Sequence, residues 1–471
     1  MKILILILTS LLLGCAHKNN IIDVDSAALP ESFIKQGSSE FDIHWWNSFG
    51  NKELTQFINQ ALDQNLSLQA NELRLKNSEI SRKIAGADYY PDLNLTANAS
   101  SDFDNFPDID TASLGLTSSW ELDIWGSISA NENRFYWNYK GQESLYKARA
   151  NLVAGNIASA WLGLVSEEEK KLVLAIQHHR TKDALNVISR RFAMGKNSVT
   201  NIWQQQRLLK SIEVQQSTNL TNIYLYKQTL ALWLGVPTNE LTKNHINVSP
   251  VLPPLPQMGL PAKLLKSRPD IELAFARIKS ANENLAIAIA ARYPRITLRA
   301  NYSTSKSSIE SLFDDWEGNL IAALTLPIFD SSTTKLVVEQ RELELKALIL
   351  DYQQVWLEAI ASVNKVLANE NQLSEVVKNL TLQLDLAERT EKLTTIQYLN
   401  GKTNYINLLR AQETILSLER QLIDANRRLV TNRVLLYREL SHGDFSLKTE
   451  LNAHEHNTQK YYNENNKGQE S

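Results

Sequence analysis

The first clear pattern in the chain is amphipathic. From position 54 onward, apolar residues recur at three- and four-residue spacing, which places them on one face of a helix. We expect this helix to run from about 54 to 88, because the ring of Pro91 disfavours a helical residue before it. The residues that share the face are Leu54, Phe57, Ile58, Ala61, Leu62 and Leu66.

After Pro91 the period of the apolar positions changes from 3.6 to 2, the spacing of a β-strand with two different faces. Segment 93–122 contains two such runs around an acidic stretch at 101–110, and segment 296–326 repeats the arrangement. Each segment therefore predicts a pair of strands. Their alternating apolar residues are Leu93, Leu95, Ala97, Ala99, Leu114, Leu116, Trp120, Leu122, Ile296, Leu298, Ala300, Tyr302, Leu320, Ala322, Leu324 and Leu326.

Each strand pair is followed by a long segment that lacks proline and is rich in helix-forming residues. The first covers about 127–193, and such a helix would extend about 100 Å at about 1.5 Å per residue. The chain then turns at Gly195, which suits a left-handed C-cap, and returns to about Gly235. The second long segment leaves from Ser331 and turns at Gly401.

The second return helix carries two neighbouring apolar stripes with a seven-residue repeat. Two stripes indicate a helix with partners on both sides, as in a wall of packed helices; an isolated coiled-coil pair is the alternative. The stripes consist of Leu408, Ile415, Leu422, Leu429 and Leu436, and of Leu409, Leu416, Ile423 and Val430.

These elements occur twice because the chain contains an internal duplication. Residues 74–91 align with 277–294 at a shift of 203, with seven identities in 18 positions. Residue frequencies alone would give roughly one identity. Each half therefore forms the same unit, and the period is too long for a solenoid. The other corresponding pairs are Trp125-Gly126 with Phe329-Asp330 and Gly195 with Gly401.

Each predicted strand has about ten residues, the length of a tilted strand that spans a membrane. Four such strands cannot close a barrel, and an open sheet edge in lipid leaves backbone groups unpaired. The strands therefore either form a small soluble sheet or are pooled by several copies of the chain. The targeting signal at the amino terminus favours pooling.

That signal predicts lipid attachment at Cys15, the single cysteine of the chain. Lys2 and the apolar run 3–13 have the form of a secretory signal, and the run is too short to cross a bilayer as a helix. Residues 12–15 (LLGC) resemble a bacterial lipobox, which implies cleavage before Cys15; an ordinary signal with a nearby cysteine is the alternative. Ala16, rather than aspartate, follows and favours the outer membrane.

Composition and motifs indicate neither catalysis nor nucleic-acid binding. A net charge of −3 argues against a nucleic-acid footprint, and one cysteine excludes a thiolate metal cluster. His178 and His179 are adjacent, so they point to different sides of a helix and cannot form an i, i+4 metal pair. We therefore expect no enzyme, no metal site and no cofactor beyond the covalent lipid on Cys15.

Taken together, these signals predict the organisation of the whole chain. The expected parts are a signal peptide at 1–14, a lipidated linker at 15–44, a first repeat at 45–249, a Pro-rich connector at 250–261, a second repeat at 262–442 and a polar tail at 443–471.

Five motifs in a fixed order identify a family. They are Trp45-Trp46-x-x-Phe49 with Ala61-Leu62-x-x-Asn65, then SWELDIWG at 119–126, LLxxRPDI at 264–271, AARYPRI at 290–296 and LPIFD at 326–330. On these motifs, residues 45–440 resemble the TolC-like outer-membrane efflux factors, in the lipoprotein branch that serves RND-type multidrug efflux pumps.

The resemblance implies a homotrimer that is mostly α-helical with a membrane β-barrel. Four strands from each of three chains would close a twelve-stranded barrel in outer-membrane lipid, and the long helices would form an α-helical barrel across the periplasm. The hairpin tips would dock onto a periplasmic adaptor, and an inner-membrane transporter would supply the energy. The chain would be a passive exit duct for drugs or other small solutes.

The resemblance also directs attention to the tips. In the best-known members, aspartates early on the last return helix narrow the periplasmic end of the duct. Here the corresponding residues are Asn407 and Arg410. We hypothesise a neutral to basic constriction in which a ring of Arg410 repels cations; the alternative is that Arg410 faces outward and pairs with Glu413. The repeat-related pore candidates are Asn201 and Gln204, and the docking candidates are Arg191, Gly195, Lys196, Gly401 and Lys402.

Two other functions are compatible with parts of the sequence. A lipid-anchored periplasmic adaptor or scaffold also has long helical hairpins, but it does not need two of them at an offset of about 206 residues, nor two strand pairs. An outer-membrane conduit for protein secretion would differ in its partners rather than in its fold.

Overall fold

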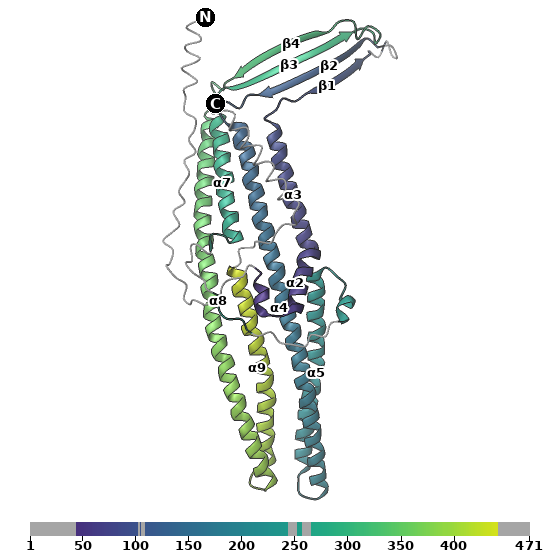
Figure 1. Cartoon of the computed structure of the whole chain (residues 1–471), viewed down its shortest axis with the longest axis vertical. Coiled ribbons are helices and arrows are strands. Elements are labelled where there is room, and N and C mark those ends of the chain that lie inside the picture. Colours follow the sequence, from purple (N-terminus) through teal and green to yellow (C-terminus); the bar gives the residue numbers. More distant parts are fainter. Residues whose placement is uncertain (1–43, 102–103, 105–108, 244–251, 257–264, 441–471) are drawn as a thin grey trace. The chain divides into compact units, whose positions relative to one another are not determined.

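The computed structural model describes residues 44–101, 104, 109–243, 252–256 and 265–440. In Figure 1, two pairs of strands alternate with helices along the chain. In chain order they are η1 (Trp45–Phe49), α2 (Lys52–Gln64), α3 (Leu66–Ala87), β1 (Asn94–Ser100), β2 (Thr111–Glu121), α4 (Ser127–Ala193), α5 (Val199–Leu234), η2 (Thr238–Lys243), α7 (Pro269–Ala290), β3 (Arg295–Lys306), β4 (Glu317–Thr325), α8 (Thr333–Leu399) and α9 (Tyr405–Leu440).

The elements confirm the predicted duplication. Helices α3 and α7 have 22 residues each, α4 and α8 have 67 each, and α5 and α9 have 36 each. Helix α4 has the bounds that its proline-free pattern predicts. No helix in the described ranges combines the length and the apolar character that crossing a membrane would require.

The chain forms two compact units, and α4 and α8 contribute residues to both. The first unit contains 72–145 and 270–356, and therefore holds the whole sheet. The second contains the described residues of 29–71, 146–269 and 357–471, and therefore holds η1, α2, α5 and α9.

In the first unit all four strands lie in one antiparallel sheet in the order β1-β2-β3-β4 (Figure 1). The central pair joins the two repeats, with Trp120 opposite Leu298 and Ala112 opposite Lys306. Strands β1 and β4 are therefore the two edges, and each pairs with one neighbour within the described chain.

The helix expected at 54–88 is two helices, because the chain breaks at Asn65. Its backbone is extended, and its side-chain amide donates to the carbonyl oxygen of Trp233 at 2.7 Å. The side-chain oxygen of the same residue accepts the N–H of Leu68 at 3.0 Å and so caps α3. The prediction of one continuous helix was wrong at this residue.

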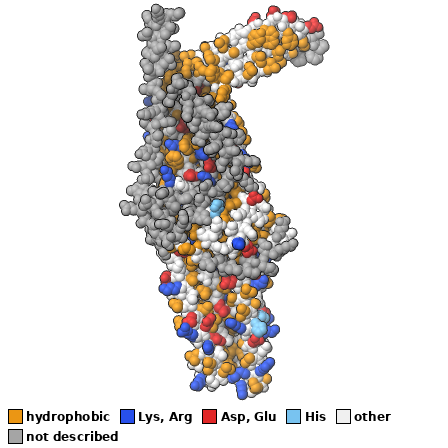
Figure 2. Space-filling view, in the orientation of Figure 1, with side chains coloured by type: hydrophobic (Ala, Val, Ile, Leu, Met, Phe, Trp, Pro, Cys, Tyr) orange, Lys and Arg blue, Asp and Glu red, His pale blue; other side chains and the backbone are white. Residues whose placement is uncertain are grey.

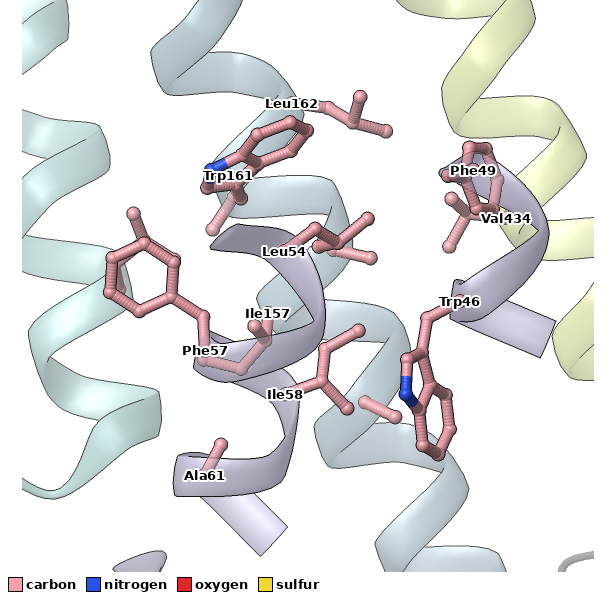
Figure 3. Packing of buried hydrophobic residues seen from close by; sticks show 14 of the residues in the cluster. Trp46, Phe49, Leu54, Phe57, Ile58, Ala61, Ile157, Trp161, Leu162 and Val434 are labelled. Atoms are coloured by element: carbon pink, nitrogen blue, oxygen red, sulfur yellow. The ribbon is translucent and has the colours of Figure 1, made fainter. Parts of the chain in front are cut away.

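The core of the second unit surrounds the start of the chain. Leu54 and Ile58 of α2 face α4, which contributes Ile157 and Trp161 (Figure 3). Trp45 of η1 stacks on a ring of α9, Tyr437, with centroids 5.9 Å apart. The aromatic motif near residue 45 therefore fastens the start of the described chain to the last return helix.

The two apolar stripes of α9 lie in the helix wall as expected. Two of the nine stripe residues, Ile415 and Leu422, are half-buried. The other seven are buried: Leu408, Leu429, Leu436, Leu409, Leu416, Ile423 and Val430.

Candidate functional site: the tips of the helical hairpins

Both helical hairpins turn through the same backbone motif. Gly195 and Gly401 have φ of +74° and +70°, in the left-handed region that glycine tolerates best. The N–H of Lys196 donates to the carbonyl oxygen of Arg191 at 2.8 Å, and the N–H of Lys402 donates to that of Gln397 at 2.8 Å. These six-residue closures are Schellman motifs, so the predicted glycine C-caps are confirmed.

The return helix α5 begins with a side-chain cap. The hydroxyl oxygen of Ser198 accepts the N–H of Thr200 at 3.2 Å, so Ser198 is the N-cap of this helix. The first tip is therefore a short turn that is closed by capping on both sides.

Behind the turns, apolar side chains from both hairpins form one cluster. The cluster brings residues of α4 and α5 against the first three turns of α9, so the two hairpins are held together near their tips. Its buried members are Leu174, Ile188, Leu208, Ile212, Tyr405, Leu408, Leu409 and Leu416.

A buried polar chain crosses this cluster and connects three helices. The hydroxyl of Tyr405 donates to Oε1 of Gln205, and Nε2 of Gln205 donates to the carbonyl oxygen of Thr181 at 2.9 Å. Burial raises the pKa of Tyr405 above its ordinary value, and nearby Tyr398 and Glu413 raise it further. The hydroxyl therefore stays protonated and can donate. The stability that its hydrogen bond to Gln205 contributes is lost only when the pH rises above about 10.

Two charged contacts also join the hairpins. Nη2 of Arg207 on α5 lies 2.7 Å from Oε1 of Glu413 on α9. The guanidinium of Arg191 on α4 lies 5.2 Å from the ring centroid of Tyr398 on α8, a cation–π arrangement. Every helix of one hairpin therefore contacts a helix of the other near the tips.

A second group of polar contacts joins α4 to α9 farther from the tips. The buried side chain of Gln177 donates to the carbonyl oxygen of Leu416 at 3.2 Å and to the carboxylate of Glu419 at 2.5 Å. Its own oxygen accepts from Arg420 at 2.8 Å. Sequence patterns did not single out Gln177, Gln205 or Tyr405.

The predicted constriction residues lie around this region but outside its core. Asn407 is exposed, and its amide donates to the hydroxyl of Thr403 at 2.9 Å. Arg410 is exposed on the same side of α9 and has no side-chain partner among the described residues. The alternative pairing of Arg410 with Glu413 is not formed in the described chain; Glu413 instead accepts from Arg207 on α5.

The repeat-related candidates on α5 are half-buried. The amide of Asn201 donates to the side-chain oxygen of Asn197. Oε1 of Gln204 is buried and has no hydrogen-bond partner in the described chain. Two of the four constriction candidates therefore lie early on α9 and two early on α5, and a ring of such residues requires more than one copy of the chain.

The docking candidates surround the turns themselves. Lys196 and Lys402 are exposed, as are Gly195 and Gly401, whereas Arg191 is half-buried against Tyr398. Lys and Arg side chains gather at this end of the hairpins in Figure 2. Cys15, the predicted lipidation site, lies outside the described residues.

Comparison with known protein families identifies the family to which this architecture belongs. A model of the family described as outer membrane efflux protein matches residues 57–236 and 260–441. The chain belongs to this family. The two matched ranges correspond to the two copies of the duplicated unit, and members of the family are outer-membrane efflux channels.

Relatives cover almost the whole chain. The pyoverdine export outer membrane protein OpmQ of Pseudomonas aeruginosa is 26% identical over 460 residues, which is 94% of this chain and 97% of OpmQ. The probable outer membrane lipoprotein SilC of Salmonella typhimurium is 24% identical over 461 residues, with 94% and 99% covered.

Solved structures share the fold. The CusC crystal structure has a TM-score of 0.78 at 22% identity and covers 88% of this chain and 97% of its own. The open-state MtrE outer membrane channel of Neisseria gonorrhoeae has a TM-score of 0.77 at 22% identity, with 88% and 96% covered.

Proposed function

We propose that this chain is the outer-membrane exit duct of a tripartite efflux pump and conducts small solutes passively out of the periplasm. The observation that carries the proposal is the duplicated unit itself: each copy contributes two strands to one open four-stranded sheet, and one pair of long helices joined by a glycine-capped tip. Family membership supports this reading over a periplasmic adaptor or scaffold.

The open sheet supports assembly of three copies. All seven residues of β1 and eight of the nine residues of β4 are exposed, although both strands contain leucines. Hydrophobic side chains also cover the visible face of the sheet in Figure 2. A sheet with exposed apolar faces and two free edges is stable in lipid only when its edges are closed. Three copies, each contributing four strands, would give one twelve-stranded barrel.

Exposed leucine and isoleucine side chains on the helices support the same assembly. In α3 and α8 they recur every seven residues, and each is more than half exposed in the single chain. A seven-residue stripe predicts a packed helical partner, and no helix within the described ranges of the same chain covers these positions. The stripes consist of Leu66, Leu73 and Ile80 on α3, and of Leu336, Leu343, Leu350 and Leu357 on α8.

The hairpin tips supply the periplasmic contacts of the proposed pump. Lys196 and Lys402 present charge at the two tips, and Met194 of the first tip is also exposed, so that tip offers both ionic and apolar contact to an adaptor. The transporter bound to that adaptor supplies the energy. In a trimer, three Arg410 side chains near the tips would repel cations, and Asn407 would add neutral hydrogen-bonding groups.

The amino terminus supplies the anchor. Lipid on Cys15 places the start of the mature chain at the periplasmic face of the outer membrane, where family members function. The relatives are named for the export of pyoverdine (OpmQ), cations (CusC) and solvents (SrpC). These names favour small solutes over secreted proteins as cargo, and leave the choice of solute to the pump.

Deleting the gene is expected to raise the cellular accumulation of a fluorescent efflux dye several-fold, and the wild-type chain should restore export. A variant with Lys196→Glu and Lys402→Glu should reach the outer membrane but fail to restore export, because it reverses the charge of both tips. The matched control is Lys378→Glu, an exposed lysine about 30 Å from the α8 tip, which should restore export fully. Unchanged dye levels after deletion of an expressed gene would contradict the proposal.

A further inference from the structure

The end of the first strand pair is fastened to the start of the second by an aromatic contact. Trp125, which follows β2, stacks on Tyr293, which precedes β3, with ring centroids 4.7 Å apart and ring planes 18° apart. The indole N–H of Trp125 donates to the carbonyl oxygen of Pro294 at 2.7 Å. Beside it, the N–H of Leu122 donates to the carbonyl oxygen of Ile296 at 3.0 Å.

Because the unit is duplicated, each of these two aromatic residues has a counterpart in the other repeat. Both counterparts are exposed in the single chain. The counterpart of Tyr293 is Tyr90, which precedes β1 and is 75% exposed. The counterpart of Trp125 is Phe329, which follows β4 and is 88% exposed, next to Ile328 at 93%. Tyr293, which stacks on Trp125, is only 45% exposed.

One chain cannot close this second junction. The contact between Trp125 and Tyr293 joins the end of β2 to the start of β3, which are neighbouring strands in the sheet. The open counterparts follow β4 and precede β1, which are the opposite edges of the same sheet. Only the β1 edge of another copy can therefore meet Phe329 in the way that β3 meets Trp125.

The backbone after β4 holds Phe329 in its exposed position. Seven residues separate β4 from α8, whereas five separate β2 from α4. In the longer connection Ser331 and Ser332 have φ of +54° and +68°, a conformation that costs a non-glycine residue free energy. The carboxylate of Asp330 fixes this turn by accepting the N–H of Ser332 at 3.0 Å and of Thr334 at 2.9 Å.

We propose that Phe329 of one copy stacks on Tyr90 of the next copy, so that an aromatic contact locks every junction between subunits as Trp125 and Tyr293 lock the junction within each chain. This inference rests on the proposed assembly and specifies the residues that hold it closed. With three copies, three contacts between chains alternate with three contacts inside chains around one axis. The exposed aromatic and aliphatic side chains are thereby covered by a second copy of the same sequence.

The test uses disulfide or short bis-maleimide cross-linking of the full-length chain in outer membranes. Cys15 is the single natural cysteine, so engineered pairs react against a simple background. The variant with Tyr90→Cys and Phe329→Cys is expected to give linked dimers and trimers on a denaturing gel. The single variants should give neither. The matched control, with Trp125→Cys and Tyr293→Cys, should react within one chain and gain no mass.

The outcomes separate this contact from the assembly itself. If the Tyr90/Phe329 cysteine pair gives no linked product while a general amine cross-linker still traps trimers, the aromatic contact is wrong and the trimer stands. If no reagent traps an oligomer, the proposed duct fails as well. Cross-linking of the Phe329→Cys single variant to itself, or labelling of that cysteine only by lipid-phase reagents, would also overturn the contact.

A second measurement does not depend on cysteine chemistry. Phe329→Ala is expected to lower the temperature at which the detergent-extracted oligomer dissociates by several degrees. Phe313→Ala, which removes another exposed ring from the β3–β4 connection, should leave that temperature unchanged. Equal dissociation temperatures for wild type and Phe329→Ala would contradict the contact.

Discussion

Replacing Glu370 by alanine is expected to lower the free energy of unfolding by about 3–5 kcal/mol, because it leaves a buried guanidinium without its carboxylate. Oε1 of Glu370 on α8 lies 2.6 Å from Nη2 of Arg433 on α9, and both side chains are less than 5% exposed. The second oxygen of Glu370 accepts the amide of Asn432 at 2.9 Å. Arg433 also donates to the carbonyl oxygen of Pro253, so the pair fixes the connector to the helices.

The comparison variant is Asp385→Ala on the same helix. Asp385 pairs with Arg389 at 2.9 Å, but both side chains are more than half exposed, so its loss should cost less than about 1 kcal/mol. Replacing the buried pair together, with Glu370→Leu and Arg433→Met, should recover part of the lost stability by removing the unpaired charge. Thermal unfolding of the detergent-extracted protein, followed by circular dichroism, measures all three. Equal losses for Glu370→Ala and Asp385→Ala would contradict the role of the buried pair.

Replacing Tyr405 by phenylalanine is expected to open the hairpin tips. The change removes the hydroxyl that donates to Gln205 and leaves the buried Oε1 of Gln205 without a partner. A buried polar group without a partner costs about 1–3 kcal/mol. If opening separates the hairpins, the ratio of open to closed tips should rise roughly 5- to 150-fold per chain. Single-channel recordings in planar bilayers should show longer and more frequent open intervals.

Two further variants define what the Tyr405 result means. Gln205→Ala removes the other side of the same link and should give the same phenotype. Arg410→Ala removes an exposed side chain that makes no bond between the hairpins in the described chain, so it should leave open intervals unchanged and reduce any preference for anions. Wild-type gating in both Tyr405→Phe and Gln205→Ala would show that this link does not hold the tips closed.

The helices and strands could be predicted from the sequence because their signals are local. The period of the apolar residues and the glycine at each turn fix the bounds of α4 and the Gly195 and Gly401 caps without reference to the rest of the chain. The break at Asn65 could not be predicted in this way, since apolar spacing continues through it. Its cause is a hydrogen bond to Trp233, which is 168 residues away.

The tips could be located from the sequence, but their connections could not. Lys196 and Lys402 follow directly from the turn sequences, whereas the pairing of Tyr405 with Gln205 depends on how two helices are rotated about their axes. A polar Gln205 on the apolar face that includes Leu208 and Ile212 was the available signal. For the same reason, the neighbour of Glu413 is Arg207 on another helix rather than Arg410 on its own.

The most direct test of the proposed trimer is electron cryo-microscopy of the full-length chain extracted from the outer membrane in detergent. We expect three copies around one axis, with β4 of each copy beside β1 of the next and a continuous lumen through the assembly. A monomer, or an assembly that leaves β1 and β4 unpaired, would contradict it.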